Sequence, residues 1–372
     1  PEHQITYCNE IIKTSSNPPS YDNLAYAGLK INSSKEWTNF SQLSAYFQKG
    51  VVIKKPQLSS IGPYPADTST SLFPEIAFAL LTDETLGAGK IINTTAVNEY
   101  NMAFSAEFCK KNGFFWDGVI SNRVNLREFI FENANYCLLD FTIIGGQFSL
   151  YPSVPTRMDY SIDFNAKPTI KAMFTDGNMK ELNVAFLSPE DRQTFKANII
   201  YRKEKLNGFS ENQSFILSLA GEEYQNDPIE TFDLSGFCTR REHAITFGKF
   251  VLSNRKLVDH TITFKTAPNY VNGLQPGNYI RVFSTTQHVQ RFNNGAILDD
   301  GTVVSKDTIS GVKSFYYWNP SEQVVRDNQI NFSDSNAVKA FAGTLFTIIE
   351  EKSSNQCYKV ESMTFGEDGL IE

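Results

Sequence analysis

The sequence lacks the residue patterns that mark most catalytic and metal-binding sites. Its 5 cysteines are scattered and none forms a CxxC pair, which argues against a disulfide framework and against a zinc site. Its 4 histidines form no HxxxH or HExxH pair, and no GxSxG nucleophile motif occurs. We therefore predict no enzymatic activity, no catalytic residue, no cofactor-binding residue and no metal ligand.

Clustered basic residues and long apolar runs are also missing. The net charge is -7 and no run of Lys and Arg exceeds two residues, whereas stable nucleic-acid binding needs clustered cations. No stretch of about 18 apolar residues occurs, which argues against a membrane-spanning helix, and the N-terminus does not resemble a signal peptide. Scattered thiols fit a reducing compartment such as a bacterial cytoplasm. The start at Pro1 and the strand-like end at 369–372 predict an excerpt of a longer protein.

A few residues superficially suggest a site. Gly87–Lys90 is similar to a phosphate-binding loop, but the GxxxxGK[ST] pattern fails because Glu84 and Ile91 occupy two required positions. The segment also follows an expected helix instead of a strand. We therefore interpret it as a tight connecting loop.

Three other groups of residues are better explained by structure than by catalysis. Cys238 lies five residues before His243, a spacing that permits a Cys–His pair, but we favour Cys238 as a small hydrophobe packed against a sheet. His260 is in register with apolar residues and is expected to be a satisfied core or interface histidine. Substituting any of these three residues should abolish no activity. Adjacent carboxylates on a strand point to opposite faces, which excludes a glycosidase pair at Glu222-Glu223, Asp299-Asp300 and Glu350-Glu351.

The composition predicts a folded, aromatic-rich β protein. The chain has 372 residues, of which 41% are hydrophobic and 13% aromatic, so two or three domains can bury ordinary cores. We predict an α+β fold, predominantly β, with several small β-barrel or sandwich modules and a few inserted helices. The expected parts are a β segment at 1–60, an α+β domain with three helices and a hairpin at 61–155, a β-barrel-like domain with one helix at 156–270, and a small OB-like β domain at 271–372.

The helices of residues 61–155 have clear boundary signals. Pro74 is typical of a first helical turn, and Asn98 is expected to cap a second helix that ends at Gly113. Asn125 and Glu128 form a capping-box-like pair at the start of a helix over 125–138. Its apolar face comprises Leu126, Phe129, Ile130, Ala134, Cys137 and Leu138. We expect this helix to pack on a hairpin turned by Gly145-Gly146, against Phe141, Ile143, Phe148 and Leu150.

Alternation predicts strands in the rest of the chain. Runs at 182–186 and 195–201 form a hairpin-like pair, Thr239 with Glu242 caps a helix to about Asn254, and 258–264 is a half-buried strand. Further strands are expected at 4–7, 24–31, 51–53, 279–283, 296–298, 302–304, 313–318, 344–350 and 358–365, with a turn at Asp299-Asp300-Gly301.

A series of short segments stands in the same order as in one known protein family. The segments are Pro1–Glu10, Leu80-Leu81-Thr82 with Leu86–Gly89, Phe108-Cys109 with Asn112-Gly113-Phe114, Asp117–Ile120, Asn125–Arg127, Leu139–Phe141, Gly146–Leu150, Cys238–Ala244 and Pro276–Val282. Together they resemble the central tail hub or tail tip attachment protein J family of long non-contractile bacteriophage tails. Asn278 stands where that family usually has Asp, so the match is to a divergent member.

The resemblance implies a structural virion protein at the tail tip, assembled in the bacterial cytoplasm. Residues 1–60 and 156–270 would belong to tube-like hub domains of a homotrimer that closes or extends the tail tube. Its partners would be the distal tail, tail-tip and tape-measure proteins. DNA would pass transiently at ejection, and contact with the host envelope would be indirect.

Two alternatives remain open from the sequence. A carbohydrate-binding or carbohydrate-active surface protein would use exposed Trp37, Trp116 or Trp318 as stacking platforms, although buried aromatics are commoner. The hub of a gene transfer agent or tailocin would have the same sequence features as that of an infectious phage. Host, receptor and channel-lining residues are not predicted.

Overall fold

The computed structural model describes residues 50–59, 65–204, 210–284, 293–305, 308–349 and 357–372. The strands expected at 4–7 and 24–31, the segment Pro1–Glu10 and Trp37 lie outside the described residues. Of the run at 51–53, only Ile53 pairs, in an isolated bridge with Thr68. The described chain is α+β, as predicted from its pattern of elements.

Three helices and a hairpin form an N-terminal lobe. Pro74 lies in the first turn of the first helix, and the Asn98 side chain accepts a hydrogen bond from the N–H of Asn101 at the start of the second. Gly113 ends the second helix with φ +75°, a left-handed conformation that favours glycine. These boundaries confirm the predictions. The elements are α2 (Phe73–Thr82), α3 (Glu99–Asn112), α4 (Leu126–Tyr136), β1 (Leu139–Ile144) and β2 (Gln147–Pro152).

The hairpin turn at Gly145-Gly146 is confirmed. Both glycines have positive φ, 59° and 80°, and Ile144 pairs with Gln147 directly across the turn. Helix α4 packs on β1, but it ends at Tyr136 and the Asn125 side chain makes no capping hydrogen bond. On the predicted faces, Ile130, Ala134, Cys137, Leu138 and Leu150 are buried, Leu126, Phe129, Phe141 and Phe148 are half-buried, and Ile143 is exposed.

A long helix and three strands form an arm lobe beside α4. The alternation at 195–201 is confirmed, because Phe195, Ala197, Ile199 and Tyr201 are all buried. Helix α6 lies close to this sheet at Gly248, where a Cβ would come within 2.3 Å of Ile199 Cδ1. The elements are β5 (Lys196–Glu204), β6 (Ser210–Leu217), β7 (Ile229–Asp233) and α6 (Arg241–Leu257), with sheet order β6-β5-β7.

Two expectations for this region are wrong. The runs 182–186 and 195–201 do not pair with each other, because β4 pairs with β8 and β5 pairs with β6 and β7. Thr239 does not cap α6: Arg240 is at the N-cap without a side-chain hydrogen bond, and the helix continues to Leu257. The Thr239 hydroxyl instead donates to Asp117, a partner distant in sequence.

Two small central sheets link the lobes. In the order β15-β9-β3, β9 is parallel to β3 and antiparallel to β15. The half-buried strand expected at 258–264 is present as β8, with His260, Ile262 and Phe264 facing inward. The run at 358–365 forms only a two-residue strand. The elements are β3 (Ile170–Thr175), β4 (Lys180–Phe186), β8 (His260–Lys265), β9 (Tyr279–Phe283) and β15 (Tyr358–Lys359), with the short helix α5 (Pro189–Arg192) after β4.

A five-stranded sheet forms the C-terminal lobe, in the order β11-β10-β14-β12-β13. The turn at Asp299-Asp300-Gly301 is confirmed, because Gly301 donates to Leu298 O and Ile297 pairs with Val303. None of the sheets in the described residues closes into a barrel, so the expected small barrels are open sheets. The elements are β10 (Asn294–Ile297), β11 (Val303–Ser305), β12 (Val312–Asn319), β13 (Val324–Asn331), α7 (Ser335–Lys339) and β14 (Thr344–Ile348).

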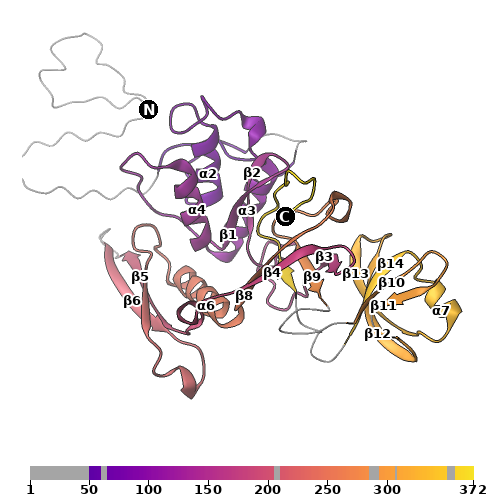
Figure 1. The fold of residues 1–372 in the computed structure, drawn as a ribbon. Helices are drawn as coiled ribbons and strands as arrows, with labels where there is room; N and C mark the ends of the chain where they lie inside the picture. The colour runs from indigo at the N-terminus through magenta and orange to yellow at the C-terminus, as the bar shows by residue number, and fades with distance from the viewer. Residues whose placement is uncertain (1–49, 60–64, 205–209, 285–292, 306–307, 350–356) are drawn as a thin grey trace, which may run out of the picture.

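The central sheets lie between the C-terminal lobe on one side and the N-terminal and arm lobes on the other (Figure 1). The N-terminal and arm lobes share one hydrophobic core, while the central sheets and the C-terminal lobe have separate cores. The C-terminus lies in the middle of the molecule, beside the central sheets (Figure 1). The architecture therefore depends on the joints between these cores.

Candidate functional site: the joints between the lobes

The first joint is formed by the loop after α3 and the start of α6. The N–H of Asp117 donates to Phe237 O at 2.8 Å, and its carboxylate Oδ2 accepts from the Thr239 hydroxyl at 2.5 Å. The Asp117 carbonyl accepts from Arg202 Nη2 at 2.5 Å. Asp117 thus binds β5 and two residues of the segment before α6, and it fixes the arm lobe on the N-terminal lobe.

Aromatic rings and a histidine fill the interior of this joint. His243, on the first turn of α6, lies 5.0 Å from the ring of Phe114 and donates from Nε2 to Tyr136 O at 2.8 Å. Trp116 packs 5.8 Å from Phe129 and donates from Nε1 to Asn133. The joint therefore combines a continuous aromatic core with hydrogen-bonded polar groups, although His243 Nδ1 is buried without a hydrogen-bond partner among the described residues.

Three cysteines lie close to His243 in this core. Contact with the thiol of Cys109 and with His243 lowers the pKa of Cys137 to about 6, while burial raises the pKa of Cys109. Burial acts to lower the pKa of His243, but the neighbouring Cys137 and Cys238 raise it to about 10. The three thiols are 0% exposed and His243 is 1% exposed, so the core encloses all four groups.

Cys238 is buried, as expected of a small hydrophobe. Its side chain is fully buried against the arm lobe and its Sγ donates weakly to Arg240 O at 3.3 Å. His260 lies elsewhere, on β8, where Nδ1 is 2.5 Å from Asp259 Oδ1 and Nε2 is 3.0 Å from the Tyr358 hydroxyl. The structure thus places His243 and Cys238 together and His260 apart from them.

The second joint connects the hairpin of the N-terminal lobe with the central sheets. The Lys359 ammonium on β15 forms an ion pair with Asp140 on β1. Gly277, with φ +90°, lies so close to the Tyr151 ring that a Cβ would come within 2.5 Å of it. Burial raises the pKa of Tyr151, with a smaller contribution from Asp140. Only glycine fits position 277 without displacing the aromatic ring.

The third joint is a buried polar network between the central sheets and the C-terminal lobe. The Asn294 side chain donates to Phe283 O at 2.8 Å and accepts from the Thr347 hydroxyl at 2.9 Å. Asp176 accepts from the Ser284 hydroxyl at 2.8 Å and lies 3.5 Å from Asn294 Nδ2. Ser284, Asn294 and Thr347 are at most 7% exposed, so the network replaces water inside the joint.

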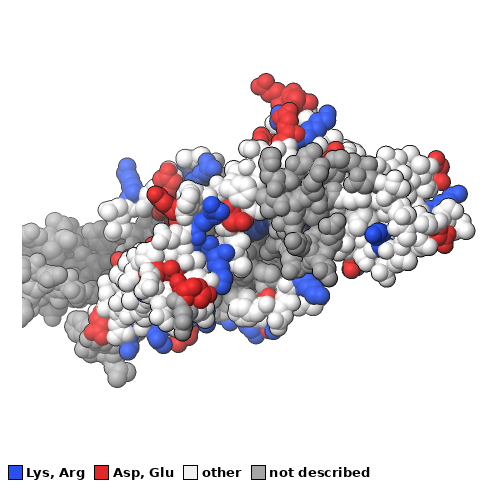
Figure 2. Space-filling view, turned by 60° about the horizontal axis from the view of Figure 1, so that its bottom comes forward, with Lys and Arg blue, Asp and Glu red and all other residues white. Residues whose placement is uncertain are grey.

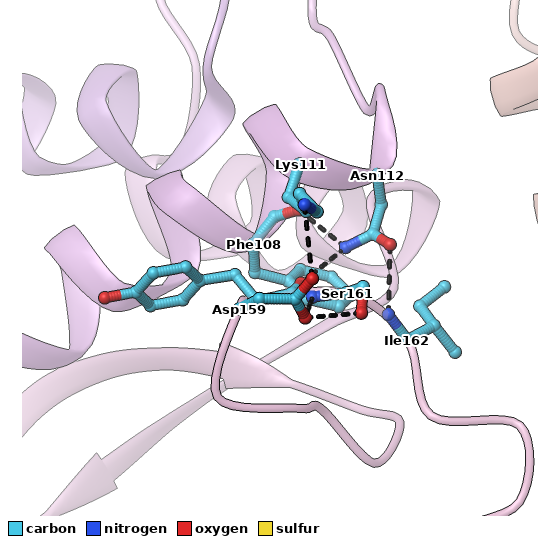
Figure 3. Close-up of polar contacts among 7 residues, drawn as sticks. Phe108, Lys111, Asn112, Asp159, Ser161 and Ile162 are labelled. Atoms are coloured by element: carbon cyan, nitrogen blue, oxygen red, sulfur yellow. Dashed lines mark hydrogen bonds and ion pairs between the residues drawn. The ribbon is translucent and has the colours of Figure 1, made fainter.

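A surface loop over residues 157–163 docks on the end of α3 (Figure 3). Asn112 holds it, donating to Tyr160 O at 2.8 Å and accepting from the N–H of Ile162 at 3.1 Å. Asp159 accepts from Ser161 and pairs with Lys111, and these contacts lower its pKa to about 2. The Asn112 side chain therefore holds the loop by bonding one of its backbone C=O groups and one of its backbone N–H groups.

The glycines at 87 and 89 are explained by close packing. A Cβ on Gly87 would lie 2.0 Å from Leu80 O, and a Cβ on Gly89 would lie 2.2 Å from Thr82 O. The Asp83 carboxylate accepts from the N–H groups of Thr85 and Leu86 in the same loop. This is the tight connection after α2 that the sequence favoured.

The tryptophans do not form an aromatic platform in the described residues. Trp116 is 8% exposed and packs in the shared core, whereas Trp318 is half-buried on β12. Burial of Trp116 removes one of the stacking residues that a carbohydrate-binding surface would need.

The described surface and side chains give no sign of other common sites. On the face drawn in Figure 2, Lys and Arg side chains lie among Asp and Glu instead of merging into one basic tract. Within the described ranges, no three His, Cys, Asp or Glu side chains are placed to hold a metal ion. No helix of the described part is long and apolar enough to cross a membrane.

Sequence reasoning missed most residues of the joints. Asp117 and Thr239 lie in segments of the family resemblance, but only the fold shows that they bind each other. Lys359, Asp176 and Asn294 lie in no motif. Their partners are between 11 and 219 residues away in sequence, so no local signal points to them.

No protein-family model matches the sequence, and no curated protein is significantly similar to it. A chain of the "Virion of native gene transfer agent (GTA) particle" is similar in structure at 10% identity and a TM-score of 0.30, covering 70% of this chain and 50% of that one. The 43 kDa tail protein of prophage MuSo2 from Shewanella oneidensis is similar at 10% identity and a TM-score of 0.28, covering 66% of this chain and 64% of that one. This chain thus spans about half to two thirds of the solved chains, and likenesses this distant assign no function.

Proposed function

We propose that the protein is a non-enzymatic structural component of a bacteriophage-type tail, part of the central hub at the tail tip. The collinear segments that resemble the tail hub family carry this proposal. In the proposed role, three copies surround a channel, bind the distal tail, tail-tip and tape-measure proteins, and let DNA pass at ejection.

The contacts that these segments make between distant parts of the chain support the proposal. Asp117, in one segment, receives a hydrogen bond from Thr239 in another that is 122 residues away. Gly277 lies in a third segment, Pro276–Val282, and its backbone packs against the ring of Tyr151. Tyr151 directly follows the segment Gly146–Leu150. The resembling residues thus hold lobes in fixed positions, which is the task of a scaffold in a particle.

The test is to locate and count the protein in the particles that contain it. Gold-labelled antibody against the folded chain should bind the tail tip, and the purified complex should have threefold symmetry in electron micrographs. Labelling of the capsid or of the tail shaft, or a complex with six equivalent copies and no threefold ring, would contradict the hub assignment.

A gene transfer agent or tailocin hub is the alternative within the same structural class. The DNA in the labelled particles separates the cases: a single phage genome, fragments of the host chromosome, or no DNA. The structural role of the chain would be the same in each.

A further inference from the structure

A large cavity lies between α6 and the central sheets. Its volume is about 1290 Å³, and it is bounded by the last turns of α6, by β8 along its length, and by residues 358–364. Successive residues from Asp259 to Phe264 all line it. Because the side chains of a strand alternate between two faces, an uninterrupted run of lining residues indicates that the cavity follows an edge of the strand.

The hydrogen-bond register identifies this edge as the side of β8 that faces away from β4, with which no other strand of the described residues pairs. The N–H of Leu187 donates to Asp259 O, so Asp259 and every second residue after it direct their backbone groups toward β4. His260, Ile262 and Phe264 therefore direct theirs toward the cavity. No hydrogen bond to these three N–H and C=O groups is found within the described residues.

The two edges of this sheet differ in their protection against further pairing. At the β4 edge, the register shifts between Lys180 and Asn183, and Glu181 has a φ of +51°. Bulges, charges and irregular backbone of this kind block pairing with another strand. The β8 edge has no proline or bulge from His260 to Phe264, and its Thr, Ile and Phe residues favour strands.

A short strand already begins to cover the β8 edge. Thr266 and Ile371 exchange both backbone hydrogen bonds, at 2.9 and 2.8 Å, and Thr364 and Glu372 do the same on the other side. In this antiparallel register, the next positions along the line of residues 370–372 fall opposite Phe264, Ile262 and His260. That line runs directly into the cavity, between β8 and residues 358–364.

We propose that the cavity is an acceptor slot for one extended polypeptide strand, presented by a partner protein and added antiparallel to β8. The added strand carries apolar side chains on the face shared with Ile262 and Phe264, and basic side chains at the alternate positions. From His260 to Phe264 the open part of the slot is about 13 Å long, at ~3.3 Å per residue. Strand addition to an open sheet edge is a general mode of peptide recognition.

The charge of the slot supports a basic strand. Asp191, Glu361 and Glu372 line the cavity and are exposed, and none of them is in an ion pair among the described residues. The two cationic residues of the lining are already engaged, Lys359 with Asp140 and Arg255 with Glu230. Leu257 and Val258, 75% and 48% exposed, provide apolar surface at the α6 end.

The test joins to the chain a short strand in which the positions of apolar and basic residues alternate in a chosen order. An extension Val-Lys-Val-Lys-Val-Lys after Glu372 places valines beside Phe264, Ile262 and His260, and tethering raises its local concentration to the millimolar range. We expect hydrogen exchange at the amides of Ile262 and Phe264 to slow at least tenfold. The matched control is Lys-Val-Lys-Val-Lys-Val, of the same composition and charge but one residue out of phase.

Equal protection by both extensions, or none by either, would overturn the strand-acceptor assignment. So would protected Ile262 and Phe264 amides in the unextended chain. In assembled particles, a photo-crosslinker attached to Thr263→Cys should join the chain to a different protein. A crosslink to a second copy or to the same chain would refute the partner as the source. The register alone carries this inference, so a failed extension test leaves the proposed tail function intact.

Discussion

At the scale of single residues, a few side chains serve several partners at once. Asp117 binds through its N–H, its carbonyl and its carboxylate, and each reaches a different residue of the arm lobe. Asn112 similarly joins α3 to two backbone groups of the 157–163 loop. Such residues are costly to replace because a partly buried polar group that loses its partner has little access to water as a replacement.

Asp117→Ala should lower the free energy of unfolding by about 1–3 kcal/mol, because the Thr239 hydroxyl loses its acceptor. Thr239→Val removes the donor of the same hydrogen bond. If the two groups act through each other, the double variant should be more stable than the sum of single losses predicts, with a coupling of roughly 0.5–3 kcal/mol. Urea unfolding of the four proteins measures this, and strictly additive losses would show that the hydrogen bond contributes nothing.

At the scale of elements, local signals place the helices but do not determine which strands pair. Pro74, Asn98 and Gly113 mark helix ends through short-range geometry, so their predictions hold. Strand pairing depends on the whole fold: 182–186 and 195–201 have the alternation of a hairpin, yet β4 pairs with β8, more than 70 residues later in the chain. Thr239 fits a helix cap by sequence, but its hydroxyl is taken by Asp117.

Helix α4 provides a matched pair of phenylalanines for testing its packing. Phe129 is half-buried, 5.8 Å from Trp116 and 6.2 Å from Phe73, whereas Phe131 is 56% exposed. Phe129→Ala should cost roughly 1.5–3 kcal/mol, below the range for a fully buried phenylalanine. Phe131→Ala should change stability by about 0.5 kcal/mol or less. Thermal unfolding that ranks the two variants equally would contradict the packing of α4 on this core.

At the scale of the whole molecule, the joints between lobes combine apolar packing with buried hydrogen bonds. The C-terminal lobe has its own hydrophobic core and meets the central sheets through a small apolar cluster around Met173 and Phe283. The same joint contains the hydrogen-bonded side chains of Asp176, Ser284, Asn294 and Thr347. Hydrogen-bonded joints fix one relative position, because a displaced lobe would leave buried polar groups unsatisfied.

Asn294→Ala should loosen the C-terminal lobe without unfolding the others. It removes the acceptor of the buried Thr347 hydroxyl, at about 1–3 kcal/mol, and one donor to Phe283 O. We expect faster hydrogen exchange in β9, β10 and β14 and unchanged exchange in α2 and α3. Asn328→Ala, at an exposed position on β13, is the control. Uniformly faster exchange throughout the chain would mean that the lobes unfold as one unit.

The sequence by itself determined the α+β class, the helix ends marked by Pro74, Asn98 and Gly113, the Gly145-Gly146 turn and the strands with strict alternation, because these depend on neighbouring residues. It also provided the ordered segments of the family resemblance. Only the tertiary structure decided which strands pair, how Asp117 meets Thr239, how Asn294 meets Thr347, and which edge of β8 pairs with no other described strand. These features depend on hydrogen bonds and packing between residues far apart in the chain, for which a local pattern contains no signal.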